Sequence, residues 1–146
     1  LVGFHYGIIP TNGKSMYYFY FLNPISKIFP FVRKRAIELN TNAMIKAMEK
    51  YPIDVITHPG SKAKLDIEKL AIFARKNDTA LEITSHHSEL SIENIEIALK
   101  TDVDFIINSD AHHPDRVGDF EIGIERALKA NVPIERIRNA KDKMEV

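Results

Sequence analysis

Four side chains that can bind a metal ion follow predicted strands at widely separated points of the chain. They are His5 in LVGFH, His58 in IDVITH, and Asp110 and His112 in FIINSDAHHP. Imidazole and carboxylate groups together suit a divalent transition metal such as zinc, iron or manganese better than magnesium or calcium. Alternate residues of an extended segment point to the same side, so Asp110 and His112 can both reach one metal ion or two adjacent ions. The sequence therefore predicts a metal site built from these four side chains.

The segments that carry these residues alternate strictly between strand and helix patterns. Strands are expected at residues 1–4, 53–57, 79–84 and 103–109, and helices at 40–51, 65–78, 91–100 and 119–131, with a short helix after Pro133. This alternation predicts an α/β fold with a parallel sheet covered by helices. The carboxyl ends of parallel strands lie along one edge of the sheet, where ligands bind in α/β sheets and barrels. Strand direction therefore brings the four side chains together.

The helix patterns also predict caps and buried faces. Asn40 or Thr41 is expected to cap the helix at 40–51, Asp66 the helix at 65–78, and Asp119 the helix at 119–131. The expected inward faces carry Met44, Ile45 and Met48 in the first helix, Ile67, Leu70, Ala71 and Ala74 in the second, and Phe120, Ile124, Ala127 and Leu128 in the last. Packed in this way, the helices would hold the strand ends in place.

Each predicted ligand also has a plainer interpretation when it is taken alone. His5 can be a hydrogen-bonded core histidine, His58 a turn residue before Pro-Gly, and Asp110 a turn cap. Short patterns such as HPG or Asp-x-His are common by chance. Their occurrence at successive strand ends is what favours metal ligation.

Other polar residues near the strand ends are assigned supporting roles. His113 is most simply a solvated neighbour, and it is also the predicted catalytic residue, as a side chain that can protonate a leaving group. His86 and His87 follow the strand at 79–84 and are interpreted as loop residues that at most line the pocket. Glu82 is interpreted as a hydrogen-bond acceptor that supports the site, and Arg116 as a surface residue.

The composition is that of a globular protein with no dominant charge. The 146 residues include 20 basic and 20 acidic side chains and no cysteine. A net charge of zero gives no general attraction to membranes or nucleic acid, although a local patch stays open, so we expect no membrane partner and do not favour a nucleic-acid partner. The absence of cysteine fits a reducing compartment, and nothing resembles a signal peptide, so a cytoplasmic location is expected.

An aromatic-rich insertion is expected at residues 8–39, with its densest part at 16–32. Pro24 and Pro30 rule out one continuous helix there, and the stretch is too short and too interrupted to span a bilayer. Packing in the core or at an interface is the favoured interpretation, and a lid over the substrate is the second.

The motifs together resemble the PHP (polymerase and histidinol phosphatase) superfamily. GFH at one strand end, THPG at the next, ALEI at the third and SDAHHP…VGDF after the fourth occur in that family's order. The phrase NTNAMIKAM before DVITHPG is similar to the small YcdX-like phosphatases of the group. The resemblance covers residues 1–146 apart from the insertion.

The resemblance implies a distorted (β/α) barrel with up to three divalent metal ions, zinc or manganese with iron as an alternative, at the carboxyl strand ends. His5, His58, Asp110 and His112 match metal-ligand positions of the family. The family's His-x-His pair and its bridging glutamate have no counterpart in these residues, so we expect the chain to be the C-terminal part of the domain. Its open sheet edges would then require the missing N-terminal half or a homo-oligomer.

The implied activity is phosphoester hydrolysis by metal-activated water, with a small phosphomonoester as the substrate. One alternative is a nuclease or proofreading module associated with a DNA polymerase. A second is a metal-binding or interaction domain without catalysis. A third, at the level of the fold alone, is another barrel hydrolase such as an amidohydrolase.

Overall fold

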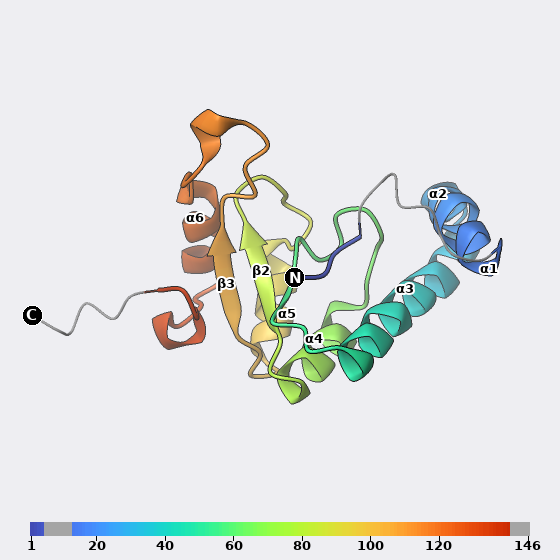
Figure 1. Cartoon of the computed structure of the whole chain (residues 1–146), viewed down its shortest axis with the longest axis horizontal. Helices are drawn as coiled ribbons and strands as arrows, with labels where there is room; N and C mark the ends of the chain where they lie inside the picture. The colour runs from blue at the N-terminus through green and yellow to red at the C-terminus, as the bar shows by residue number, and fades with distance from the viewer. Residues whose placement is uncertain (5–12, 141–146) are drawn as a thin grey trace, which may run out of the picture.

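The computed structural model describes residues 1–4 and 13–140, and its centre is a parallel sheet (Figure 1). Three strands, β1 (Val55–Ile56), β2 (Ala80–Thr84) and β3 (Phe105–Asn108), are paired in the order β1-β2-β3. Val2 pairs in parallel with Ile56 on the outer side of β1, and Ile137 pairs with Phe105 on the outer side of β3. The predicted α/β class with parallel strands in sequence order is confirmed.

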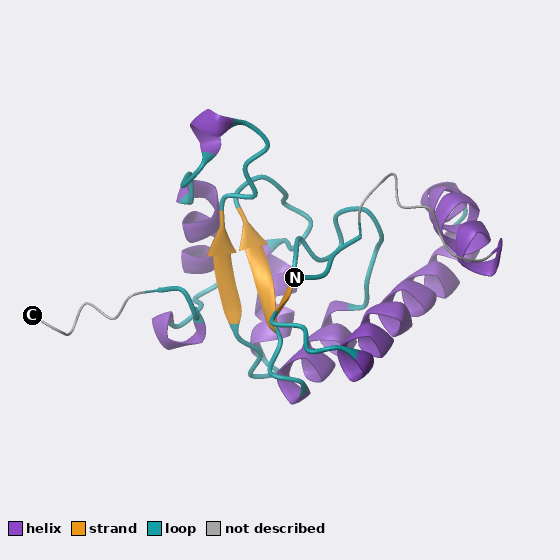
Figure 2. Cartoon of the chain, in the orientation of Figure 1, coloured by secondary structure: helices purple, strands orange, loops and turns teal. Residues whose placement is uncertain are grey.

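The core lies between this sheet and the helices that follow its strands (Figure 2). The helices are α3 (Pro30–Lys50), α4 (Ile67–Lys76), α5 (Ile92–Leu99) and α6 (Glu121–Lys129), with short 3-10 helices at Pro114–Arg116 and Ile134–Arg136. Helices that follow one another in the sequence contact one another, from α3 to α4, α5 and α6. Strand β2 is buried along its whole length, as its apolar run predicts.

Helix α4 shows how local sequence determines an element. The Asp66 carboxylate accepts a hydrogen bond of 3.0 Å from the Lys69 backbone N–H, which satisfies an otherwise unpaired donor of the first turn. The predicted inward residues Ile67, Leu70, Ala71 and Ala74 are all buried. Full burial of a Leu or Ile side chain contributes roughly 1.5–3 kcal/mol, so this face anchors the helix.

Helix α3 begins ten residues earlier than predicted, at Pro30 rather than Asn40. The expected inward residues Met44, Ile45 and Met48 are buried, but Asn40 and Thr41 lie within the helix and cap nothing. The Asn40 side chain exchanges hydrogen bonds with the Asn23 side chain, and the Thr41 hydroxyl accepts one from the Asp66 backbone N–H. These two side chains therefore form tertiary hydrogen bonds instead of capping the start of α3.

Helix α6 is rotated relative to the prediction. Ala127 is buried, but Phe120, Ile124 and Leu128 are exposed, and Phe120 rather than Asp119 precedes the first helical residue. The buried positions include Gly123 and Arg126 instead. A Cβ at Gly123 would lie 2.9 Å from Cγ2 of Ile107, so this glycine allows the helix to approach β3 closely.

The described part of the predicted insertion forms short helices at the end of α3 that is remote from the sheet (Figure 1). They are α1 (Gly13–Tyr17), a π-helix (Tyr18–Leu22) and α2 (Asn23–Ile28). The chain breaks between α2, which ends at Ile28, and α3, which starts at Pro30, so the prediction that no single helix spans this stretch is confirmed there. Pro24 does not interrupt the helix, since it lies in the first turn of α2 within a helical run from Gly13 to Ile28. No helix within the described ranges is long and apolar enough to cross a membrane.

Candidate metal centre

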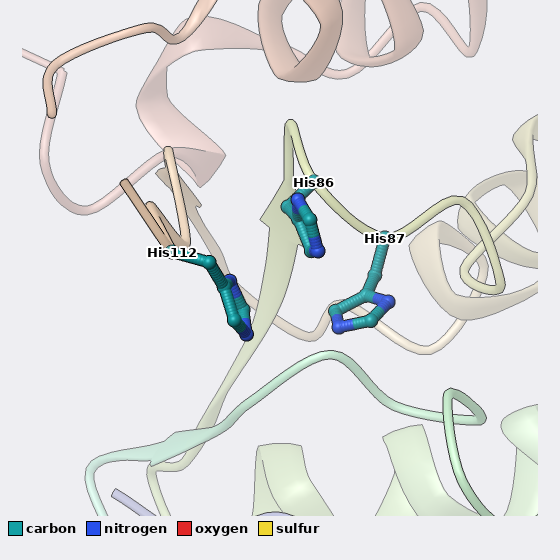
Figure 3. A group of neighbouring side chains, drawn as sticks. All are labelled: His86, His87 and His112. Atoms are coloured by element: carbon teal, nitrogen blue, oxygen red, sulfur yellow. The ribbon is translucent and has the colours of Figure 1, made fainter. Parts of the chain in front are cut away.

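Histidines from three loops meet at the carboxyl end of the sheet. His86, His87 and His112 each offer a ring nitrogen, and these nitrogens all lie within 4.8 Å of one another (Figure 3). The His86 and His112 rings are stacked with centroids 4.2 Å apart, and the His58 and His87 ring centroids are 5.1 Å apart. Asp110 adds a carboxylate oxygen 3.6 Å from Nε2 of His87. Parallel strand direction therefore gathers imidazole and carboxylate groups at one edge of the sheet.

Glu82 connects the ends of the three strands. Its buried carboxylate accepts a hydrogen bond of 2.8 Å from the His58 backbone N–H and another of 3.0 Å from the Asn108 side chain. His58 has a φ of 30°, a conformation that L-residues rarely adopt, and the bond to Glu82 helps to hold it there. The interpretation of Glu82 as a supporting acceptor is confirmed.

Gly3 allows the first segment of the chain to lie directly against this strand end. A Cβ at Gly3 would meet the Thr57 hydroxyl oxygen at 2.2 Å and Cε1 of the His58 ring at 3.0 Å. Any side chain at this position would displace one of these groups. The missing Cβ thus keeps the His58 ring in its present place.

Arg126 stabilises the loop after β2 through hydrogen bonds to its backbone. The guanidinium group donates hydrogen bonds to the backbone carbonyls of Thr84, His87 and Leu90, with 3.0 Å to each of the last two. Burial lowers the pKa of Arg126 from its ordinary value, and the nearby Glu89 carboxylate opposes that change. Five donors in a rigid fork allow one arginine to bind several carbonyls at once. Arg126 therefore fixes the backbone from which His86 and His87 project.

The loop after β3 determines which nitrogen of His112 is available to a ligand. Nδ1 of His112 lies 2.8 Å from the Asp110 backbone carbonyl, which can only accept a hydrogen bond, so Nδ1 carries the proton. Nε2 is then left with a free lone pair, the form in which histidine binds metals. Asp110 has a φ of 48°, in the left-handed region that Asp tolerates better than most residues.

The charge state of His87 also suits a ligand. Burial lowers the pKa of His87 below 6.5, and the positive charge of Lys62 acts in the same direction, while the Glu89 and Asp110 carboxylates oppose it. Neutral imidazole, the form able to bind a metal, is therefore favoured near neutral pH.

The donors fit a divalent transition metal in both chemistry and spacing. Zinc bonded tetrahedrally at about 2.1 Å places its ligand nitrogens about 3.4 Å apart, so modest side-chain rotations would close a group spread over 4.8 Å. Oδ2 of Asp110 is buried and has no hydrogen-bond partner among the described residues, which leaves it available to a cation. The histidine group can therefore hold a metal ion.

The structure assembles some of the predicted site residues and separates others. His58, Asp110 and His112 lie at the same edge of the sheet, whereas His5 lies outside the described residues. The His113 side chain is 70% exposed, and its Nδ1 lies 3.3 Å from the Asp115 carboxylate rather than within the histidine group. His86 and His87, which the sequence indicates as loop residues that at most line the pocket, follow the end of β2 and belong to the histidine group.

The comparisons with known proteins point to hydrolases of phosphate esters. The chain is 35% identical over 111 residues to a protein named "Probable phosphatase" from Shewanella piezotolerans, covering 70% of this chain and 45% of that protein. It is 32% identical over 148 residues to a second "Probable phosphatase" from Shewanella sediminis, covering 95% of this chain and 51% of that protein. It therefore spans about half the length of these curated relatives.

A polymerase with a nuclease activity in its name is a further relative. The chain is 30% identical over 109 residues to "DNA polymerase/3'-5' exonuclease PolX" from Bacillus subtilis, covering 68% of this chain and 19% of that protein. No protein-family model matches the chain. Both printed activities, phosphatase and exonuclease, cleave esters of phosphoric acid.

Proposed function

We propose that this chain carries part of the metal site of a PHP-type phosphoesterase that hydrolyses small phosphomonoesters. The observation that carries the proposal is the convergence of His86, His87 and His112, with His58 and Asp110, at the carboxyl end of a parallel sheet. The similarity to proteins named probable phosphatases supports the same reaction class.

The residues present provide ligands whose orientation is already determined. When bound, a divalent ion such as zinc or manganese supplies activation of water and neutralisation of phosphoryl charge. His112 offers Nε2 because its Nδ1 proton is held by the Asp110 carbonyl, and His87 is kept neutral by burial. Glu82 holds the backbone N–H of His58, and Arg126 holds the backbone of the loop that carries His87. Such preorganisation lowers the cost of assembling the site.

Several finer features belong to the same proposal. The sequential parallel strands, with consecutive helices in contact, support a segment of a (β/α) barrel. Within it, His5 is the fourth predicted ligand and the intact site holds up to three metal ions. The pairing of this chain with an N-terminal half or with a second copy, and its cytoplasmic location, stay predictions.

The experiment measures metal binding and hydrolysis in the same variants. Zinc affinity is measured by isothermal titration calorimetry, and turnover with p-nitrophenyl phosphate in the presence of zinc or manganese. We expect His112→Ala to weaken zinc binding and turnover at least tenfold. His113→Ala should retain zinc binding and lower turnover about 100-fold if His113 protonates the leaving group. Undiminished zinc affinity and turnover in correctly folded His112→Ala would refute the metal role of this site.

A second candidate function is exonucleolytic cleavage of DNA, which the similarity to PolX favours. The site chemistry would be the same, because both reactions place a phosphate ester against the metal ligands. The two are separated by comparing turnover on p-nitrophenyl phosphate with release of nucleotides from a 3'-labelled single-stranded oligonucleotide. Faster cleavage of the oligonucleotide would replace the phosphatase proposal by this one.

A further inference from the structure

The basic and acidic residues are unevenly distributed along a chain whose net charge is zero. Residues 1–37 contain five basic residues, Lys14, Lys27, Arg33, Lys34 and Arg35, and no Asp or Glu. The remaining residues therefore contain 15 basic and 20 acidic side chains, a net charge of −5 against +5. An average over the whole chain conceals this separation.

The same N-terminal region exposes large apolar side chains. In residues 13–35, here called the aromatic segment, Ile28 is 73% and Phe31 80% exposed, and Tyr17, Phe21 and Phe29 are also exposed. Isolated exposed apolar residues are ordinary, but a concentration of them in one segment marks a binding surface. Ring contacts between Tyr17 and Phe21, and between Phe29 and Phe31, show that these side chains are neighbours.

The aromatic segment is attached to the rest of the molecule through its polar side. The Asn23 and Asn40 side chains exchange hydrogen bonds of 2.7 and 3.3 Å, and Ser26 is buried with its hydroxyl donating to the Asn23 carbonyl. Ile28 and Phe31 stay exposed in spite of this attachment. The segment is also remote from the histidine group, at the far end of α3 (Figure 1).

The exposed cations adjoin the apolar side chains. Lys27 precedes Ile28, and Arg33 and Lys34 follow Phe31 within one turn of α3, all of them exposed. Among the described ion pairs of this segment, only Arg35 has a carboxylate partner, Glu38 at 2.9 Å. A surface that joins aromatic and aliphatic groups to unneutralised cations is complementary to a negatively charged surface with an apolar interior.

We propose that the aromatic segment binds the surface of a bilayer that contains anionic phospholipid. Its aliphatic side chains, Ile25 and Ile28, suit the acyl region, while phenolic and cationic groups suit the headgroup region. Single-stranded nucleic acid would bind the cations and stack on the aromatic rings, but it would not bind exposed isoleucines favourably. The inference is independent of the proposed hydrolysis. It differs from the expectation of no membrane partner, which used the charge of the whole chain.

The test is co-sedimentation with vesicles of phosphatidylcholine alone and of phosphatidylcholine with 30% phosphatidylglycerol. We expect binding to the anionic vesicles only, and a loss of affinity of about 30-fold in Arg33→Gln/Lys34→Gln, from about 1 kcal/mol per cation. The matched control Arg75→Gln/Lys76→Gln removes an Arg-Lys pair of α4 that is also exposed, and it should bind as the unaltered chain does.

The contribution of apolar side chains to vesicle binding is tested with a second variant and its matched control. Ile28→Ser should lower affinity for the anionic vesicles about tenfold, whereas Leu128→Ser, at a similarly exposed position on α6, should not. Circular dichroism confirms the fold of every variant. Equal binding to both vesicle types, unchanged affinity in the aromatic-segment variants, or tighter binding of oligo(dT) than of the anionic vesicles at equal salt would each overturn the proposal.

Discussion

Replacing the buried Arg126 by methionine should destabilise the protein more than replacing an exposed arginine. The buried guanidinium donates to the carbonyls of Thr84, His87 and Leu90, and methionine fills similar space without a donor. Three acceptors at the end of β2 would then lose their partner. Water cannot easily replace it, because Thr84 and Leu90 are buried.

The expected loss in the free energy of unfolding follows from the number of hydrogen bonds that Arg126 donates. At about 1 kcal/mol per hydrogen bond, the three carbonyls account for roughly 3 kcal/mol, which the removal of a buried charge reduces to about 2.5 kcal/mol. An unfolding entropy of about 2.1 cal/mol/K per residue gives about 0.3 kcal/mol/K for a chain of this length. The melting temperature should therefore fall by roughly 8 °C.

The assay is thermal unfolding of the metal-free protein followed by circular dichroism. The matched control is Arg116→Met, since Arg116 is exposed and its ion-pair partner within the described part of the chain is Asp119 at 2.9 Å, a contact worth less than about 1 kcal/mol. Arg126→Met should also weaken zinc binding, because the loop that carries His86 and His87 loses its support. A melting temperature of Arg126→Met within about 1 °C of the control variant would refute the reasoning.

Three further predictions test other parts of the molecule. Burial lowers the pKa of His87 below its unfolded value of about 6.5, so the unfolded state binds more protons than the folded state. The metal-free protein should therefore lose stability as the pH falls through 6.5, and His87→Gln should reduce the change of melting temperature between pH 7.5 and 5. Gly123→Ala should lower the free energy of unfolding in urea by about 1–2 kcal/mol, because its Cβ would lie 2.9 Å from Ile107, and this outweighs the better helix propensity of alanine. The control Gly13→Ala should cause no such loss, because no described atom lies within 4 Å of its Cβ. Asn139→Ala removes side-chain hydrogen bonds to both the N–H (3.0 Å) and the carbonyl (2.7 Å) of Ile107 at the edge of β3. We expect a loss of about 1–3 kcal/mol in the free energy of unfolding and faster amide exchange at Ile107, and unchanged exchange would contradict this role.

The candidate site was predictable where a strand delivers its residue directly. His58, Asp110 and His112 follow β1 and β3, and parallel pairing alone brings those ends to one edge of the sheet. His86 and His87 also follow a strand, but the sequence predicts at most a pocket-lining loop there, because their orientation depends on contacts that sequence spacing does not contain. The relevant contacts come from Arg126, which follows them by about forty residues.

The difference between α4 and α6 has the same origin. In α4 the cap and the apolar spacing agree, so periodicity was sufficient to identify the buried residues. In α6 the apolar spacing pointed to Phe120, Ile124 and Leu128, yet the helix turns Gly123 and Arg126 inward. The close approach of Gly123 to Ile107 and the hydrogen bonds of Arg126 to the loop after β2 accompany this orientation of the helix, and neither is visible in a local pattern.

The sequence by itself determined the order of strands and helices, the parallel sheet and the edge at which metal-binding residues collect. These properties depend on local periodicity and on the direction of the chain, both of which are written residue by residue. Only the tertiary structure decided which face α6 buries and which histidines meet. Those outcomes depend on hydrogen bonds between groups far apart in the sequence, such as Arg126 with Thr84 and Glu82 with His58.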